Sequence, residues 1–224
     1  MMKELHSRGV SIEDIAEVIQ RAPIHPRIIT ANKSARALGC DLKIISDANT
    51  FFIDTILKHH GIWECFSEIN TNPSFIDEER RLRILPQHDF TKSSHGCKNP
   101  CPPNMCKGVV IERIKAAEGK KKMIIYLGDG IGDFCPSLKL DNGDYVMPRK
   151  NFPVWDLICK NRSAIKAEIH EWGDGEEMGK MLLGLIINAI SMQREQQDLT
   201  SPRMDFKFPP TVLDALPSPL SVPH

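Results

Sequence analysis

The sequence lacks a net charge and a long apolar run, and each absence excludes a class of protein. Its 224 residues carry 29 Lys+Arg and 29 Asp+Glu, so no net field favours nucleic acid or an anionic membrane as a partner. The longest apolar stretch, residues 181–190, is interrupted by Gly184 and Asn188 and is too short to cross a bilayer. We therefore expect a core helix there, no nucleic-acid partner and no membrane insertion.

The sequence also lacks an apolar signal segment and a disulfide framework. Residues 1–6 read MMKELH and contain no apolar core of the kind that a secretion signal needs. The seven cysteines are an odd number and are not spread as in a small secreted domain. These features predict a reducing, cytoplasmic setting.

The most informative stretch is the segment from Gly128 to Asp133, which reads GDGIGD. It follows an apolar run, residues 123–127, that is typical of a buried parallel strand, and open α/β sheets bind ligands where such strands end. Asp129 and Asp133 lie four residues apart with no basic residue between them, an arrangement that suits a hard divalent cation. The loop thus predicts a magnesium site, with a tight turn that carries two solvated acids as the alternative. A dinucleotide fingerprint is excluded, because Asp133 occupies its third glycine position.

The rest of the chain alternates between helical and strand patterns. Ser11 and Asp14 predict a capping box at the start of one helix, and a second helix is expected over about residues 27–38. A strand over 42–45, a polar loop, a helix that ends at Gly61 and a strand over 66–71 form a βαβ pattern. An α/β fold follows from this order.

The second half is expected to continue this pattern after an irregular region. Residues 74–106 are predicted to be irregular, with a hairpin around 78–80. The expected elements after them are a helix from Lys107 to Ile114, strands over 123–127 and 145–147, and helices near 153–171 and 174–193. Prolines then crowd the end of the chain, which predicts a disordered tail over 194–224.

Three polar positions fall at the ends of these expected elements: Ser46, Lys107 and the Asp129/Asp133 pair. Strand ends and helix starts gather at one edge of a parallel sheet. A hydroxyl, an ammonium group and a magnesium site gathered there would form a phosphate pocket. Taken alone, Ser46 is equally well explained as the N-cap of the next helix, whereas a lysine at a helix start is mildly disfavoured by the helix dipole.

The segments that carry these residues resemble conserved motifs of a known superfamily. Residues 44–49 (IISDAN), 104–108 (NMCKG) and 126–133 (YLGDGIGD) resemble motifs two, three and four of the haloacid dehalogenase superfamily of phosphatases. More narrowly, the chain resembles the phosphoethanolamine/phosphocholine phosphatase family, and above all its plant members, described as pyrophosphatase or thiamine phosphate phosphatase-like. Residues 89–93 and 146–156 fit as well, and the resemblance covers about residues 1–193.

The resemblance implies a Rossmann-like parallel sheet with helices on both faces. Residues 1–25 would be the remnant of a helical cap, 26–193 the α/β core and 194–224 the tail. The implied activity is a magnesium-dependent hydrolysis of small phosphomonoesters through an aspartyl-phosphate. Phosphoethanolamine, phosphocholine, pyrophosphate and thiamine phosphate are the implied substrates, so the partner would be a small phosphorylated metabolite.

The resemblance also implies a role for each of the polar positions. Ser46 would bind the phosphoryl group, and Lys107 would stabilise the charge of the nucleophile and the phosphate. Asp129 would ligate magnesium, and Asp133 would support that metal site.

Two further residues beside Ser46 are expected to line the substrate pocket. They are Asp47 and Asn49. An anionic Asp47 would suit a cationic amine head group, and an acid that favours the start of a helix is the alternative.

The chain departs from the family at the first motif. The family opens with a strand that ends in Asp-x-Asp-x-Thr, whose first aspartate is the nucleophile and whose second is the general acid; this pattern does not occur in the 224 residues. We therefore expect the nucleophile-bearing first strand to be missing and the 224 residues alone to be inactive. A non-catalytic remnant that binds a ligand, a metal or a partner is the alternative function.

A cysteine cluster supports a third hypothesis, a zinc-stabilised interaction module. Cys97, Cys101 and Cys106 lie close together in the sequence, with His88 and His95 nearby. Their spacing differs from the usual two-residue interval between zinc-binding cysteines. Free thiols in a loop are the alternative.

Overall fold

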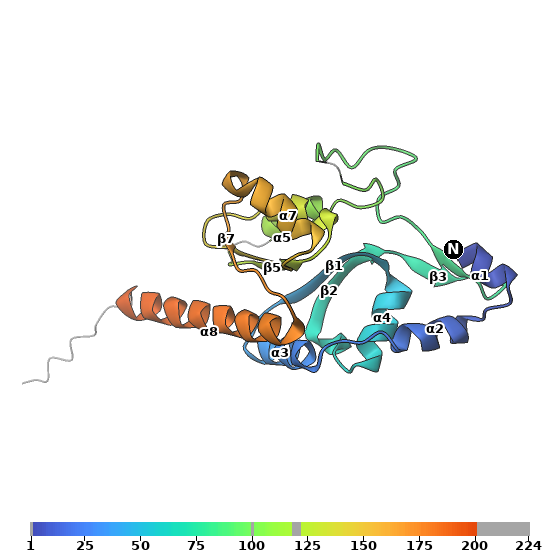
Figure 1. Ribbon diagram of the computed structural model, residues 1–224, viewed down its shortest axis with the longest axis horizontal. Helices are drawn as coiled ribbons and strands as arrows, with labels where there is room; N and C mark the ends of the chain where they lie inside the picture. Colours follow the sequence, from blue (N-terminus) through green and yellow to red (C-terminus); the bar gives the residue numbers. More distant parts are fainter. Residues whose placement is uncertain (1, 100, 118–121, 201–224) are drawn as a thin grey trace, which may run out of the picture. The chain divides into compact units, whose positions relative to one another are not determined.

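The computed structural model describes residues 2–99, 101–117 and 122–200 (Figure 1). The chain divides into two compact units, Met1–Ile186 and Ile187–His224, and the boundary lies within the last helix, α8 (Gly175–Thr200). That helix continues past residue 193, the end that the sequence predicted. The remainder of the predicted tail, 201–224, lies outside the described residues.

Three helices precede the first strand: α1 (Met2–Ser7), α2 (Ile12–Gln20) and α3 (Pro26–Ala37). The predicted capping box at the start of α2 is confirmed. The Ser11 hydroxyl accepts from the Asp14 amide at 3.1 Å, and the Asp14 carboxylate accepts from the Ser11 amide at 2.9 Å. Hydrogen bonds from Ser11 lower the pKa of Asp14, so the cap is strongest when this carboxylate is ionised.

The predicted βαβ unit is also confirmed. β1 (Leu42–Asn49) and β2 (Phe66–Asn72) pair in parallel, and α4 (Thr50–His59) and the short helix η1 (Trp63–Cys65) connect them. β1 is longer than the expected 42–45, but its register with β2 becomes irregular between Ile45 and Asn49. Ser46 therefore lies in the irregular last part of the strand.

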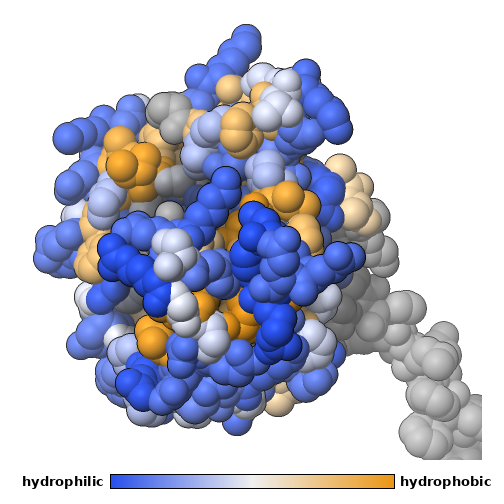
Figure 2. All heavy atoms as spheres, turned by 90° about the vertical axis from the view of Figure 1, so that its right-hand side faces the viewer, coloured by the Kyte–Doolittle hydropathy of each residue, from blue (hydrophilic) through white to orange (hydrophobic). Residues whose placement is uncertain are grey.

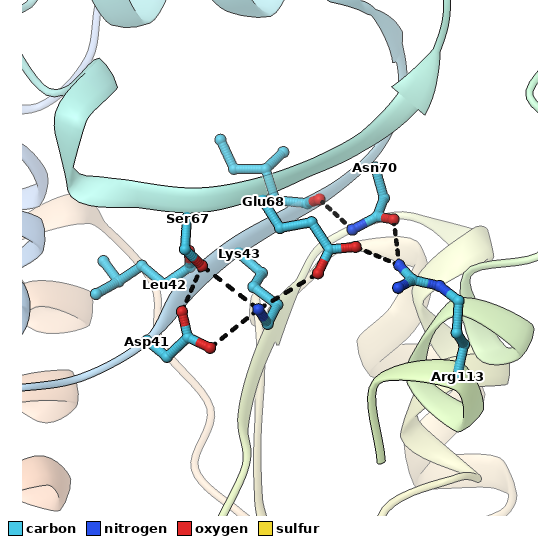
Figure 3. A network of polar contacts seen from close by, with 8 residues as sticks. Asp41, Leu42, Lys43, Ser67, Glu68, Asn70 and Arg113 are labelled. Carbon is cyan, nitrogen blue, oxygen red and sulfur yellow. Dashed lines mark hydrogen bonds and ion pairs between the residues drawn. The ribbon is translucent and has the colours of Figure 1, made fainter. Parts of the chain in front are cut away.

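Helices cover both faces of this two-stranded sheet. On one face, α3 and α4 pack through a cluster that includes Ile53 and Leu57 of α4 and contacts Ile44 and Ile69 of the strands. On the other face, α5 (Lys107–Ala117) makes polar contacts, which Figure 3 shows.

Charged side chains connect α5 to the face of the β1–β2 sheet that it covers. Arg113 of α5 forms an ion pair with Glu68 and donates to the Asn70 carboxamide oxygen at 2.6 Å. Lys43 of β1 lies 3.3 Å from the Glu68 carboxylate. Although burial opposes the shift, hydrogen bonds from Arg113 and Lys43 lower the pKa of Glu68. Ion pairs and hydrogen bonds thus join α5 to β2, and through Glu68 to Lys43 of β1.

A second sheet contains three parallel strands in the order β5 (Ile125–Gly128), β6 (Tyr145–Pro148) and β7 (Glu168–Ile169). Two short helices, η2 (Ile131–Asp133) and α6 (Phe134–Ser137), follow β5. Between β6 and β7 lie α7 (Pro153–Lys160) and η3 (Arg162–Ala164). With parallel strands in both sheets and helices on both faces of the first, the predicted α/β fold class is confirmed.

The helix predicted over 153–171 is wrong beyond residue 160. Ile165 and Ala167 are buried while Lys166 and Glu168 are exposed. This alternation has the period of a strand, and it leads into β7, which pairs with β6.

The two sheets share a hydrophobic core but no backbone pairing. Ile111 of α5, Tyr126 of β5 and Val146 of β6 belong to one buried cluster, and Ile45 of β1 packs against it. In the part of the chain that the structure describes, β1 is hydrogen-bonded only to β2, and β5 only to β6. Each of these strands therefore has one edge without a partner strand among those residues.

A hairpin projects from the end of β2. β3 (Ser74–Ile76) and β4 (Leu82–Ile84) pair in antiparallel fashion, as the turn predicted at 78–80 requires, and Arg80 adopts a positive φ of 56° there. Phe75 and Ile76 are half exposed, and Figure 2 shows exposed apolar atoms among larger hydrophilic areas.

Of the helices that the structure describes, none has both the length and the apolar character of a membrane span.

Candidate functional site

The acidic loop after β5 is organised by Asp133. This side chain is 4% exposed, and its two oxygens accept four hydrogen bonds. One oxygen accepts from the backbone amides of Asp129 at 3.0 Å and Gly130 at 2.9 Å. The other accepts from the Lys107 ammonium at 2.8 Å and from the Tyr126 hydroxyl at 2.7 Å. Both oxygens are thus engaged in folding the loop.

The glycine at the end of β5 makes room for this arrangement. A Cβ on Gly128 would lie 2.5 Å from both the Cβ and the Cγ of Asp133. Real side chains do not approach so closely, so any larger residue at 128 would displace the Asp133 carboxylate.

Lys107 and Asp133 form a largely buried ion pair. Their side chains are 13% and 5% exposed. Burial and the neighbouring Asp133 carboxylate raise the pKa of Tyr126 well above its usual value, so its hydroxyl keeps the proton that it donates. The loop is therefore built around one negative charge that a cation and three neutral donors compensate.

Asp129 differs from Asp133 in both its exposure and its contacts. Its side chain is exposed, and its carboxylate has no hydrogen-bond or ion-pair partner among the described residues. Its backbone is nevertheless fixed, because its amide donates to Asp133 and its carbonyl accepts from the Val154 amide at 3.3 Å. The carboxylate thus projects from a rigid backbone and is available for a cation.

The end of β1 lies close to this loop. The Asp47 carboxylate lies 3.4 Å, and the Cε of Lys107 3.8 Å, from the position that a Cβ on Gly132 would take. The structure therefore brings Asp47 and Lys107 close to the acidic loop. The sequence predicted this gathering for Ser46, Lys107 and the Asp129/Asp133 pair at the edge of a parallel sheet. Ser46 precedes Asp47, is half-buried, and accepts from the Ala48 amide at 3.2 Å.

Asn49 is the residue that caps α4. Its carboxamide oxygen accepts from the Phe52 amide at 3.1 Å, and its side chain is 3% exposed. The alternative interpretation of Ser46 as this N-cap is wrong, because the irregular end of β1 delays the helix until Thr50.

Sequence reasoning did not identify two residues that shape the site. One is Tyr126, whose hydroxyl is the one polar side-chain group in the apolar run before the loop. The other is Asn72, at the end of β2. Its amide group donates to the carbonyls of Asp47 at 2.9 Å and Ala48 at 2.8 Å, and so fixes the end of β1. A polar residue where a strand ends was the available signal for Asn72.

The three clustered cysteines are brought together, and a fourth joins them. The thiols of Cys97, Cys101 and Cys106 meet that of Cys135 from α6, which no sequence pattern singled out. His95 lies outside the group of thiols, where its ring contacts the Cys97 amide and a backbone carbonyl.

Comparison with known proteins places the chain in a family. The profile described as "Putative Phosphatase" matches residues 1–186. The chain is 58% identical over 201 residues to "Inorganic pyrophosphatase 2" of Arabidopsis thaliana, a match that covers 88% of this chain and 72% of that protein. It is 51% identical over 189 residues to "Thiamine phosphate phosphatase-like protein" of the same plant, covering 83% and 77%.

The name of a more distant relative contains the two substrates of the family that the motifs resemble. The chain is 31% identical over 182 residues to the human "Phosphoethanolamine/phosphocholine phosphatase", a match that covers 77% of this chain and 66% of that protein. Since the family profile spans most of the sequence and the motif segments lie within it, the chain belongs to this family of haloacid dehalogenase-type phosphatases.

Proposed function

We propose that this chain binds the phosphoryl group of small phosphorylated metabolites, together with magnesium, where β1 and β5 end. The observation that carries the proposal is the largely buried Lys107 ammonium, which donates to Asp133 and whose side chain, like the Asp47 carboxylate, lies near Gly132. A cation and free carboxylates at the carboxyl ends of parallel strands suit a phosphate ester with its metal.

The carboxylates present fit a magnesium ion. The Asp129 carboxylate has no side-chain partner among the described residues, so its oxygens are available as the hard ligands that magnesium prefers. Asp133 accepts four hydrogen bonds and therefore supports the site without needing to ligate. Bound magnesium would neutralise part of the charge of the phosphoryl group.

Lys107 and Ser46 would hold the phosphoryl oxygens. The Lys107 ammonium carries three donors and uses one of them on Asp133, which leaves others for a phosphate. The Ser46 oxygen accepts from the Ala48 amide, so its own proton is available for donation. Both residues would stabilise negative charge that grows during phosphoryl transfer.

Asp47 would select the group attached to the phosphate. Its exposed carboxylate, which lies near Gly132 of the acidic loop, is complementary to a cationic amine. Phosphoethanolamine and phosphocholine carry such a cation, and pyrophosphate does not. In a protein that also carries a strand ending in Asp-x-Asp-x-Thr, we expect Asp47→Asn to weaken activity on the first two esters more than on pyrophosphate. An equal effect on all three substrates would contradict this role.

The nucleophile would come from a strand that is not part of these 224 residues. No Asp-x-Asp-x-Thr pattern occurs in them, and the edges of β1 and β5 are without a partner strand among the described residues. A strand at these edges would place the first aspartate of that motif near Lys107, where it could form an aspartyl-phosphate. The 224 residues alone would then bind phosphate without turnover.

We also propose that the protein acts in the cytoplasm, as its sequence predicts.

The test compares residues 1–224 with the same chain preceded by a strand that ends in Asp-x-Asp-x-Thr. Both are assayed with magnesium on phosphoethanolamine, phosphocholine, pyrophosphate and thiamine phosphate. We expect turnover only in the strand-bearing protein. Turnover near about one per second by residues 1–224, with contaminating phosphatase excluded, would contradict the proposal. Phosphate binding by both without turnover by either would favour the non-catalytic alternative.

A further inference from the structure

We propose that Cys97, Cys101, Cys106 and Cys135 bind one zinc ion through four thiolates. The four sulfur atoms lie within 4.8 Å of one another. They come from two separate parts of the chain: the loop before α5, which supplies Cys97, Cys101 and Cys106, and α6, which supplies Cys135. This site is distinct from the phosphate site and does not depend on the function proposed above.

The distances between the sulfur atoms match a zinc tetrahedron. Zn–S bonds of about 2.3 Å at tetrahedral angles separate neighbouring sulfurs by about 3.8 Å. The Cys97 sulfur lies 3.8 Å from that of Cys101 and 3.6 Å from that of Cys135. The Cys106 sulfur lies 3.6 Å from that of Cys101 and 3.7 Å from that of Cys135. The four thiols thus form a closed ring that surrounds one point.

Disulfides and simple packing account less well for this geometry. A disulfide requires sulfurs about 2.05 Å apart, well below any of the separations here, and all seven cysteines are free. Thiols that pack as small apolar groups have no reason to converge in a set of four from separate segments. Four cysteines without an open position are instead typical of structural zinc.

The surroundings supply a hydrogen-bond donor to one of the sulfurs and a pocket beside the cluster. The Asn99 amide donates to the Cys135 sulfur at 3.3 Å, as outer groups around metal-binding thiolates do. A pocket of about 370 Å³, lined by residues that include Cys97, Lys98 and Lys139, opens beside the cluster. The two lysines would offset the net negative charge of a zinc tetrathiolate, and the pocket provides a path for the metal.

A glycine allows the buried side of the cluster to form. A Cβ on Gly108 would lie 2.5 Å from the Cys135 sulfur, so the first turn of α5 has room for this thiol only because residue 108 is glycine. Cys106 and Cys135 are 4% and 2% exposed.

The position of the cluster gives the zinc a structural role. Cys106 directly precedes Lys107, and Cys135 follows Asp133 by two residues. One ion bound to both cysteines would fix the two chain segments that form the Lys107–Asp133 pair, as well as the long loop before α5.

Metal analysis of the full chain tests the proposal without an activity assay. The protein is purified under reducing conditions, and its zinc content is measured by plasma mass spectrometry. We expect one zinc per chain in the parent and in Cys159→Ser, which alters an exposed cysteine outside the cluster. We expect loss of zinc in Cys106→Ser and in Cys135→Ser. A zinc content unchanged by both of these substitutions would overturn the proposal.

Two measurements on the unaltered protein remain informative if those variants fail to fold. Replacement of zinc by cobalt should give the intense visible bands and near-ultraviolet charge transfer of a tetrahedral thiolate site. Thiol labelling followed by mass spectrometry should show that a chelator exposes all four cysteines of the cluster together. An absence of zinc and of cobalt uptake, disulfides between the four, or labelling that is insensitive to the chelator would each contradict a zinc site.

Discussion

The ends of the two parallel sheets are each organised by one buried side chain with four hydrogen bonds, but the two side chains differ in charge. At the end of β5, Asp133 accepts all four bonds. At the end of β2, Asn72 donates to two carbonyls and accepts from the Gln87 amide at 3.0 Å and from Asn104 at 3.1 Å. Asp133 is 4% exposed and Asn72 is 6% exposed.

The difference shows why only one of the two ends needs a cation. A buried carboxylate can only accept hydrogen bonds and carries a charge that is costly to bury unpaired. Lys107 therefore holds the fold together as well as facing the proposed phosphate. The neutral Asn72 both donates and accepts hydrogen bonds, so its burial needs no charged partner. It binds the end of β1 through backbone carbonyls, which leaves the side chains of Ser46 and Asp47 free of this network. The following substitutions test this contrast.

Removal of the cation should have the largest effect on stability. Lys107→Ala would leave the buried Asp133 carboxylate without its charged partner, which we expect to cost about 3 kcal/mol in the free energy of unfolding. Denaturant titration of the full chain measures this loss. Lys115→Ala in the same helix is the control, because its ion pair with Asp141 is more exposed and should be worth less than about 1 kcal/mol. Equal losses in the two variants would contradict the charged role of Asp133.

A charge placed at the neutral end should be the next most damaging change. Asn72→Asp keeps the size of the side chain but replaces two donors by an oxygen that faces the carbonyls of Asp47 and Ala48. We expect a loss of about 2 kcal/mol. Asn161→Asp is the control, because Asn161 is exposed and donates to a single carbonyl. If Asn72→Asp is as stable as this control, the network around Asn72 does not fix the end of β1.

Loss of a single neutral donor to Asp133 should have an intermediate effect. Tyr126→Phe removes the hydroxyl that donates to this carboxylate at 2.7 Å, for which we expect about 1.5 kcal/mol. The other tyrosine of the chain provides a matched control, since Tyr145 is partly buried and its hydroxyl has no hydrogen-bond partner among the described residues. Thermal melts of both variants should show a clear shift for Tyr126→Phe only.

The smallest effect on stability is expected at Ser46. Its hydroxyl accepts one local hydrogen bond from the Ala48 amide, so Ser46→Ala should change the free energy of unfolding by less than about 0.5 kcal/mol. The same variant should weaken the binding of inorganic phosphate, measured by calorimetry in the presence of magnesium. Unchanged phosphate affinity would remove Ser46 from the proposed site.

Local signals in the sequence predicted most elements of the fold. The capping box at Ser11 and Asp14 and the βαβ unit formed as expected, because both depend on patterns within a short window. The error after residue 160 arose in the short segment that leads into β7, where Glu168 and Ile169 form a strand by pairing with β6. Propensity gives way to tertiary context in such segments.

The candidate site was predicted where a residue stands out by its place at a helix start or in a glycine-rich loop, and it was missed where no such local feature marks the residue. Lys107 and Asp133 stand out by their positions, and the structure joins them. The roles of Asn72 and Cys135 depend on residues that are far away in the sequence, at Asp47 and Cys97. No local pattern marks such contacts.

The central claim is that a metal-dependent phosphate site lies between the two strand ends, and Asp129 tests it most directly. Its carboxylate is exposed and has no side-chain partner among the described residues, so Asp129→Asn should leave the melting temperature unchanged. The measurement is turnover across a magnesium titration in the strand-bearing protein. Glu64→Gln is the control, because Glu64 is an exposed acid at the opposite end of β2. We predict that Asp129→Asn loses magnesium-dependent turnover while Glu64→Gln keeps it. Turnover by Asp129→Asn within a few-fold of the parent at every magnesium concentration would contradict the claim.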